Sequence, residues 1–182
     1  MPVYISMLRG INVGPHNKIK MDRLRESFEA LGFEQVKTYV QSGNVVFKTA
    51  KRSTSDLSKK IEERVLKDFG YSVPVISKTA EEMGKTIQNN PFLTMKGIDA
   101  SKLHVTFLSQ VPGQPALKKL DALVAGSDEF HYCGNEIYLY CPNGYGRTKL
   151  SNNALERVLG VRATTRNWRT VNNLYQISLD YN

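Results

Sequence analysis

Apolar and polar residues follow two different periods in the first half of the chain, and these periods distinguish strands from helices. Alternating side chains predict a strand over 3–8, and short apolar segments bounded by turn residues predict strands over 36–40, 45–48 and 73–76. Apolar residues at helical spacing predict helices from about 21 to 31 and from 53 to 69, ended by glycines at 32 and 70. Pro74 puts the last strand at a sheet edge, because proline has no N–H to donate. The order strand, helix, strand, strand, helix, strand is that of the ferredoxin-like βαββαβ unit.

A similar order begins again after a connecting helix through Ile87, for which Thr79 and Glu82 form a capping box, and a linker over 90–100. The second half is expected to contain a strand over 103–108, a helix over 115–124, a hairpin over 129–133 and 136–141, and a helix over 151–159. In place of a clear fourth strand, we expect a last helix from about 165 to 179. The sequence therefore predicts an α+β protein with two tandem ferredoxin-like halves, 1–78 and 101–182, joined by 79–100. The C-terminal helix is expected to close the second half.

The chain of 182 residues carries a net charge of +8, which favours anionic partners such as nucleic acid or phosphorylated metabolites. The positive charges are scattered in pairs, so the alternative is an ordinary solvated surface. No apolar run approaches the ~20 residues that span a bilayer, and the first residues lack the features of a signal peptide. We expect a cytoplasmic protein with no membrane partner, and the sequence leaves its oligomeric state open.

Metal and disulfide chemistry are not expected. Cys133 and Cys141 flank the predicted hairpin, whose turn is Gly134-Asn135, and lie too far apart in register to form a bridge. The three histidines lack the spacing of metal ligands, and no motif identifies a cofactor.

Recognisable catalytic motifs are also scarce in the sequence. Ser42 does not lie in the Gly-x-Ser-x-Gly motif of a nucleophile elbow. Asp22 and Glu26 share a helix face, where paired carboxylates are usually solvated.

A first polar cluster follows from the predicted topology. In a βαββαβ sheet the first and second strands are parallel, so the loop after the first lies beside the turn after the second. Glycines let backbone N–H groups face a ligand, and a following helix N-terminus favours an anion. The candidate anion-binding residues here are Arg9, Gly10, Asn12, Lys18, Lys20, Gln41, Ser42 and Asn44. The stretch is not a P-loop, because it lacks a terminal Gly-Lys-Ser/Thr, and a plain strand-to-helix loop is the alternative.

A second polar cluster lies near the predicted starts of two late helices, with Lys149 at one and Arg166 and Asn167 at the other. Cations are unfavourable at a helix N-terminus unless an anion or an acidic partner is close. These residues therefore complete the candidate anion site. The alternative is that Thr164 or Thr165 caps the last helix and the arginines pair with surface carboxylates.

An exposed aromatic sheet face is a further possibility, because RNA-binding sheets stack bases on aromatic side chains. Tyr138, Tyr140, His131 and His104 are expected to share one face of the second sheet. Neither half carries the basic-aromatic pattern of an RNA recognition motif, so this face can equally be packed.

Several of these stretches also carry a family resemblance. The segments LRGINVG (8–14), NKIKM (17–21), TYVQSGNVVF (38–47), YGRTKL (145–150) and ATTRNWRTV (163–171) resemble the signatures of domain-of-unknown-function family 1697. Pro15 and His16 depart from the family pattern, which usually has a glycine and a lysine or similar residue there. The resemblance covers essentially the whole chain. It implies a bacterial-type cytosolic α/β protein with polar, loop-borne signature positions, and it supplies no activity.

The leading hypothesis is a protein of unknown function that binds an anionic ligand in a basic cleft between the halves. The ligand is expected to be a nucleotide, a phosphorylated metabolite or nucleic acid backbone. Two alternatives remain open. One is an enzyme of unknown class acting on a phosphorylated small molecule in the same cleft, which a general base with a perturbed pKa would favour. The other is a protein-interaction module without enzymatic activity.

Overall fold

The computed structural model describes residues 1–124 and 126–181. Its contacts divide the chain into two compact units, which we call unit 1 (1–85 and 173–182) and unit 2 (86–172). The boundaries fall inside helices α3 (Ala80–Gln88) and α6 (Trp168–Leu179). The chain therefore begins and ends in unit 1.

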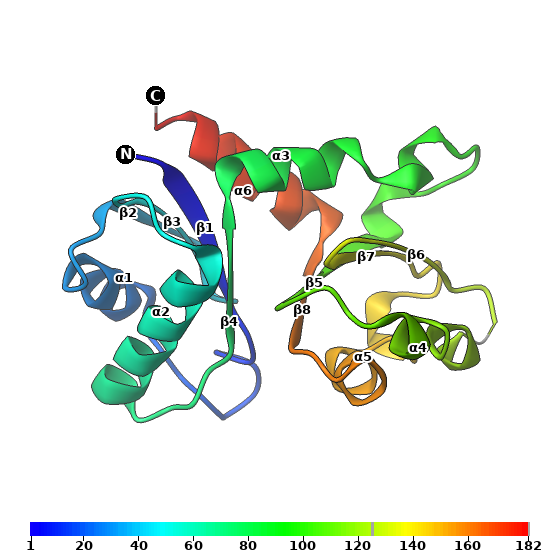
Figure 1. The fold of residues 1–182 in the computed structure, drawn as a ribbon, viewed down its shortest axis with the longest axis horizontal. Helices are drawn as coiled ribbons and strands as arrows, with labels where there is room; N and C mark the ends of the chain where they lie inside the picture. The colour runs from blue at the N-terminus through cyan, green and yellow to red at the C-terminus, as the bar shows by residue number, and fades with distance from the viewer. Residues whose placement is uncertain (125, 182) are drawn as a thin grey trace. The chain divides into compact units, whose positions relative to one another are not determined.

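Unit 1 is built around a four-stranded antiparallel sheet of order β2-β3-β1-β4, with α1 and α2 covering one face (Figure 1). Its elements before α3 are β1 (Val3–Leu8), α1 (Met21–Glu29), β2 (Glu34–Tyr39), β3 (Asn44–Lys48), α2 (Thr54–Phe69) and β4 (Val75–Thr79). The core on this face contains a cluster of aromatic rings, in which Phe33 stacks on Phe47 at 4.4 Å. The predicted caps of α2 are confirmed, since the Ser53 side chain accepts from the Asp56 N–H and Gly70 adopts a left-handed conformation.

The last turns of the chain pack on unit 1. The Asn173 side chain donates to the Tyr39 hydroxyl at 2.5 Å. The Tyr181 hydroxyl lies 2.6 Å from the Gln35 carbonyl oxygen and 2.8 Å from that of Val46. Gln35 lies in a bulge of β2, where the register shifts between Glu34 and Lys37, so Tyr181 occupies hydrogen-bonding positions that the distorted ladder leaves open.

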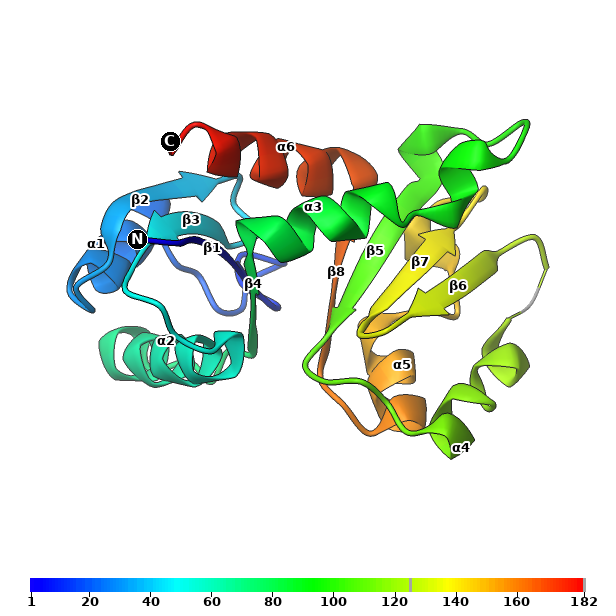
Figure 2. The ribbon, with the colours of Figure 1, turned by 45° about the horizontal axis from the view of Figure 1, so that its top comes forward.

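Unit 2 repeats the element order with a sheet of order β6-β7-β5-β8 (Figure 2). Its main elements are β5 (Leu103–Leu108), α4 (Gln114–Leu117), β6 (Glu129–Cys133), β7 (Glu136–Tyr140), α5 (Asn152–Leu159) and β8 (Ala163–Asn167). Short 3-10 helices η1 to η4 lie at Pro91–Thr94, Ala100–Lys102, Leu120–Leu123 and Tyr145–Arg147. Leucines from α4 and α5 pack against Ile137 and Leu139 to form the core.

The predicted fold class is confirmed at the level of a mixed α+β protein with two four-stranded antiparallel sheets and, in the described residues, six α-helices. The strands predicted over 3–8 and 103–108 have the predicted bounds. The capping box is present, with the Glu82 carboxylate accepting from the Thr79 N–H at 2.8 Å and the Thr79 hydroxyl accepting from the Glu82 N–H at 3.1 Å.

The prediction of a helix from residue 165 was wrong. Residues 163–167 form β8, which pairs antiparallel with β5, and α6 begins only at Trp168. The helix is capped by the Asn167 side chain, which accepts from the Thr170 N–H at 2.8 Å, and not by Thr164 or Thr165. The β-branched threonines suit a strand, and the sheet edge offered by β5 decides between the two conformations.

Three further segments also differ from the predictions. Pro74 precedes β4, and its carbonyl accepts from the Arg9 N–H at 2.9 Å. The expected helix over 115–124 is divided into the short α4 and η3. The connecting segment contains η1 and η2, and Phe92 in η1 is fully buried.

None of the helices within the described residues combines the length and apolarity needed to cross a membrane.

Candidate functional site

The loop after β1 and the turn after β2 lie together in unit 1, as the topology predicted. Both strands pair antiparallel with β3, so they run parallel to each other. The Asn12 side chain donates to the Gln41 carbonyl at 2.8 Å, and the Leu8 N–H donates to the Gly43 carbonyl at 2.8 Å. The loop and the turn of the first candidate cluster are therefore in direct contact.

Asn12 organises this loop from a left-handed backbone conformation, with φ 55°. Its amide nitrogen also donates to the Ile19 carbonyl at 2.8 Å, and its amide oxygen accepts from the Ile19 N–H at 2.9 Å. The Asn17 side chain donates to the Gly10 carbonyl at 3.2 Å. These bonds hold the loop in one shape, so the Asn12 side chain positions the loop and its polar atoms already have protein partners.

The turn between β2 and β3 depends on buried residues. Asn44 is fully buried and donates to the Tyr39 carbonyl at 3.1 Å and to the Ser42 hydroxyl at 3.0 Å. Gly43 has φ +83°, and a Cβ atom there would lie 2.6 Å from the Ile11 Cδ1 atom. The half-buried Ser42 and the exposed Gln41 complete the turn. Packing therefore accounts for Gly43 and Asn44 without a ligand.

The cations of the first cluster lie at the edges of this surface. Lys18 and Lys20 are exposed, and Arg9 is half-buried. Lys20 is the N-cap residue of α1 and makes no side-chain capping bond. Gly10 is exposed, with φ +73°. The lysines are the members of this cluster that a dissolved anion reaches most easily.

The second candidate cluster is divided by the sheet of unit 2. Arg166 pairs with Val105 and Asn167 with His104, so neighbouring residues of β8 face opposite sides. Arg166 is buried, donates to the Thr164 hydroxyl at 2.9 Å and to the Thr165 carbonyl at 3.0 Å, and burial lowers its pKa to about 10. Asn167 and Lys149 are exposed. The structure thus places Asn167 beside His104 and separates it from Arg166.

A pocket of about 370 Å³ lies next to Asn167 at the beginning of α6. Its described lining contains an arginine and a histidine but no carboxylate: Ala100, Ser101, His104, Asn167, Trp168 and Arg169. Arg169 is exposed in the first turn of α6, which contains no acidic residue. Just outside this lining, the Asp99 carboxylate accepts from the Ser101 hydroxyl at 2.7 Å. The lining itself combines one arginine with polar and aromatic groups.

His104 is half-buried in this pocket and stacks on Tyr145, with ring centroids 4.8 Å apart. Burial lowers its pKa below the ordinary value, and the Lys102 backbone opposes this shift in part. Its Nδ1 atom is buried and has no hydrogen-bond partner in the described residues. The imidazole is therefore neutral at pH 7 and can accept or donate a proton.

Ser101, His104 and Arg169 were not among the residues predicted for the site. Arg169 lies in the late signature stretch, which was the signal that could have identified it. His104 joins the site only because β8 pairs with β5 and puts Asn167 directly opposite it.

The aromatic face predicted for RNA stacking is not an open platform. His104 pairs with Leu139 and so lies on the opposite face from Tyr138, which contradicts the predicted grouping. Tyr138 is buried and donates to the Thr86 carbonyl at 2.7 Å. Phe92 packs against His131 and Tyr140, with centroid distances of 5.0 and 5.9 Å. Tyr138 is therefore unavailable to bases, and Phe92 occupies one side of the His131 and Tyr140 rings.

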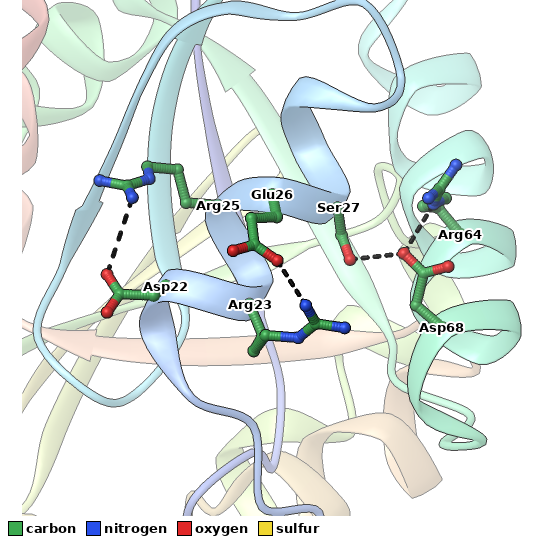
Figure 3. Close-up of polar contacts among 7 residues, drawn as sticks. All are labelled: Asp22, Arg23, Arg25, Glu26, Ser27, Arg64 and Asp68. Carbon is green, nitrogen blue, oxygen red and sulfur yellow. Dashed lines mark hydrogen bonds and ion pairs between the residues drawn. The ribbon is translucent and has the colours of Figure 1, made fainter.

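The surface of α1 is also polar, but its charges are paired (Figure 3). Glu26 accepts from Arg23 at 2.7 Å, and Asp22 lies 3.9 Å from Arg25, so the expectation of ordinary solvated carboxylates is reasonable. Between the helices, Asp68 accepts from the Ser27 hydroxyl at 2.5 Å and from Arg64 at 2.7 Å.

The Ser27 hydrogen bond, aided by Arg64, holds the pKa of Asp68 below its ordinary value. This contact joins α1 to α2 and is structural. In the described residues, no group of three or more His, Cys, Asp or Glu side chains could hold a metal ion.

The two sheets and the pocket define a small α+β protein with an arginine-containing candidate site in unit 2. The family model of the proteins of unknown function DUF1697 matches residues 1–138, so the chain belongs to that family. The fold is similar to the structure of the conserved bacterial protein SP0830 from Streptococcus pneumoniae, with a TM-score of 0.73 and 22% identity. That alignment covers 97% of this chain and 98% of the other. No curated protein matches the chain.

Proposed function

We propose that this protein binds a small anionic molecule in the pocket lined by Ser101, His104, Asn167 and Arg169. The observation that carries the proposal is the composition of the lining, which includes an arginine and no carboxylate among the described residues. Phosphorylated metabolites and nucleotides are the favoured ligands, because arginine forms bidentate hydrogen bonds with phosphate oxygens.

The position of Arg169 supports an anion. It lies in the first turn of a twelve-residue helix, where the helix dipole makes a cation unfavourable. A bound anion would interact favourably with both the helix N-terminus and the guanidinium. Because Asn167 caps this helix with its side-chain oxygen, the pocket is fixed to a regular element and its geometry is preorganised.

The size of the pocket favours a small molecule over a nucleic acid backbone. A volume of about 370 Å³ lies in the range of ordinary small-molecule sites. The rings of His104 and Trp168 supply flat walls for the organic part of the ligand.

We propose further that both units are ferredoxin-like. The strand orders β2-β3-β1-β4 and β6-β7-β5-β8 support this, because each combines the βαββαβ element order with a first strand between the third and fourth. It stays a prediction that residues of both halves, including Arg9, Lys18 and Lys20, share one basic cleft.

Arg169→Ala is expected to abolish ligand-induced stabilisation. The probes are inorganic phosphate, nucleotides, sugar phosphates and a short RNA, compared by thermal shift at low and moderate salt. A ligand present at about 100 times its dissociation constant stabilises the native state by about 2.7 kcal/mol. Arg157→Ala removes the same charge from the exposed side of α5 and serves as the matched control.

Stabilisation by one small phosphorylated compound, lost in Arg169→Ala and kept in Arg157→Ala, would support the pocket. Stabilisation by RNA alone that fades steeply with salt would mean backbone binding and would contradict a small-molecule site. No response to any probe would also contradict it.

An enzyme is the second candidate, and His104 is the specific observation that favours it. A neutral imidazole beside an arginine has the properties of a general base acting on an anionic substrate. If the pocket is catalytic, His104→Gln will remove turnover of the ligand that the thermal shift identifies and will retain its binding.

The pH dependence of stability tests the environment of His104. Because burial lowers its pKa in the folded state, the unfolded chain takes up the proton first as the pH falls below about 6.5. The wild type should therefore keep its full stability above pH 6.5 and lose part of it below that value, as the pH falls toward the lower folded-state pKa. Denaturation midpoints measured between pH 5 and 8 check this.

His104→Gln should remove that acid-side loss, while His16→Gln in an exposed loop should leave it unchanged. If His104→Gln loses as much stability below pH 6.5 as the wild type does, another group causes the loss.

A further inference from the structure

The outer edge of β6 is the most exposed strand edge in unit 2. β6 is the end strand of its sheet, and four of its five residues are exposed (Figure 2). Among the described residues, no backbone hydrogen bond joins 129–133 to any segment other than β7. One row of N–H and C=O groups on β6 is therefore available for pairing.

The other three edge strands carry a bulge or a cation that discourages pairing, whereas the one charged residue of β6 is Glu129 at its first position. β2 has a bulge and Lys37, β4 contains Lys78, and β8 contains Arg166. β6 pairs with β7 over five residues in a regular register and contains no proline, lysine or arginine. Bulges and cations are the usual protection of an edge strand, so β6 is the edge best suited to accept another strand.

The backbone direction of each β6 residue follows from the hydrogen bonds of the sheet. Asn135 and Cys141 bond to the β5 side, since the Leu108 N–H donates to the Asn135 carbonyl and the Cys141 N–H donates to the Lys102 carbonyl. Backbone groups alternate along a strand, so the even-numbered residues of β7 face β6. Their partners Glu129, His131 and Cys133 therefore bond inward, and Phe130 and Tyr132 direct their N–H and C=O groups to the free edge.

We propose that β6 pairs antiparallel with β6 of a second copy of this chain, about a two-fold axis at His131. This register places Phe130 opposite Tyr132 of the copy, twice, in the hydrogen-bonded positions that face outward. The two side chains form cross-strand aromatic pairs, which are favourable in sheets. Tyr132 is 47% exposed in the single chain and becomes covered in this arrangement.

The charges are compatible with this self-pairing. Glu129 lies opposite Cys133 of the copy, and His131 lies opposite its own copy on the two-fold axis, so no carboxylate directly faces another. The two copies of Glu129 lie at opposite ends of the paired strands, about 14 Å apart at ~3.4 Å per residue. A single five-residue strand buries less surface than a stable dimer interface, so the expected dimer is weak and depends on concentration.

The first experiment compares sedimentation equilibrium of the wild type with that of Tyr132→Pro over a wide concentration range. Proline removes an outward N–H and leaves the inward ladder to β7 intact. Both copies lose a hydrogen bond, so the dissociation constant should rise by about tenfold or more. Tyr132→Thr keeps the N–H and is the control for loss of the ring.

The second experiment tests the register without disturbing the backbone. Glu129→Cys places a thiol opposite Cys133 of the copy, at a non-hydrogen-bonded pair whose Cα atoms are about 4.5 Å apart, within disulfide range. Mild oxidation should give covalent dimers of Glu129→Cys. The wild type and the double variant Glu129→Cys, Cys133→Ser should give no covalent dimers.

Concentration-dependent dimers together with this cross-linking pattern would establish the pairing. A strictly monomeric wild type that also fails to cross-link as Glu129→Cys would overturn the proposal. Dimers that persist in Tyr132→Pro, or wild-type cross-links through Cys133, would mean another surface or register and would equally overturn it.

Discussion

Gly43→Ala is expected to lower the free energy of unfolding of unit 1 by about 2 to 5 kcal/mol. An L-residue in the left-handed conformation costs about 1–2 kcal/mol, and an overpacked core costs about 1–3 kcal/mol more. Both terms apply, because Gly43 has φ +83° and a new Cβ would lie 2.6 Å from Ile11 Cδ1 and 2.9 Å from Leu8 Cβ. Urea denaturation followed by circular dichroism measures the loss.

Gly32→Ala separates the two contributions. Gly32 has φ +80°, but no atom lies within 4 Å of the position that a new Cβ would take, so only the conformational cost of about 1–2 kcal/mol applies. Equal losses in both variants would mean that the contact with Ile11 relaxes without cost. A larger loss in Gly43→Ala would show that the turn and the loop before α1 pack as one structure.

Tyr181→Ala is expected to destabilise unit 1 by about 3 to 5 kcal/mol, the usual cost of removing a buried aromatic side chain. Tyr181 is only 4% exposed, its hydroxyl reaches the Gln35 and Val46 carbonyls, and the Lys37 ammonium lies 4.8 Å from its ring centre. Hydrogen exchange of the β2 and β3 amides should locate the loss in unit 1, where the residue binds.

Tyr181→Phe keeps the ring and removes the hydroxyl, so its expected cost is about 1–2 kcal/mol. Tyr132→Phe removes a hydroxyl from an exposed ring and should change stability by less than about 0.5 kcal/mol. If Tyr181→Ala costs no more than Tyr132→Phe, the C-terminal turns do not stabilise unit 1.

Part of the candidate site was predictable and part was not. The parallel relation of β1 and β2 put Asn12 beside Gln41, because element order alone fixes which loops share an end of the sheet. The sequence could not distinguish residues that hold such a loop from residues that face a ligand. Asn12, Asn44 and Asn167 have the same polar side chain and all three bond to backbone groups, but only Asn167 also lines the pocket.

Local periodicity by itself determined most of the elements, including β1, β5, the capped α2 and the hairpin in which Cys133 pairs with Glu136. The helix and the hairpin depend on contacts between residues close in sequence, while β1 and β5 were recognised from the pattern of apolar residues along each strand, although their partner strands are distant in sequence. The tertiary structure alone decided that 163–167 form β8 and that His104 lies opposite Asn167. A short threonine-rich segment is compatible with a strand or a helix start, and it adopts the strand because β5, distant in sequence, supplies its hydrogen-bond partners.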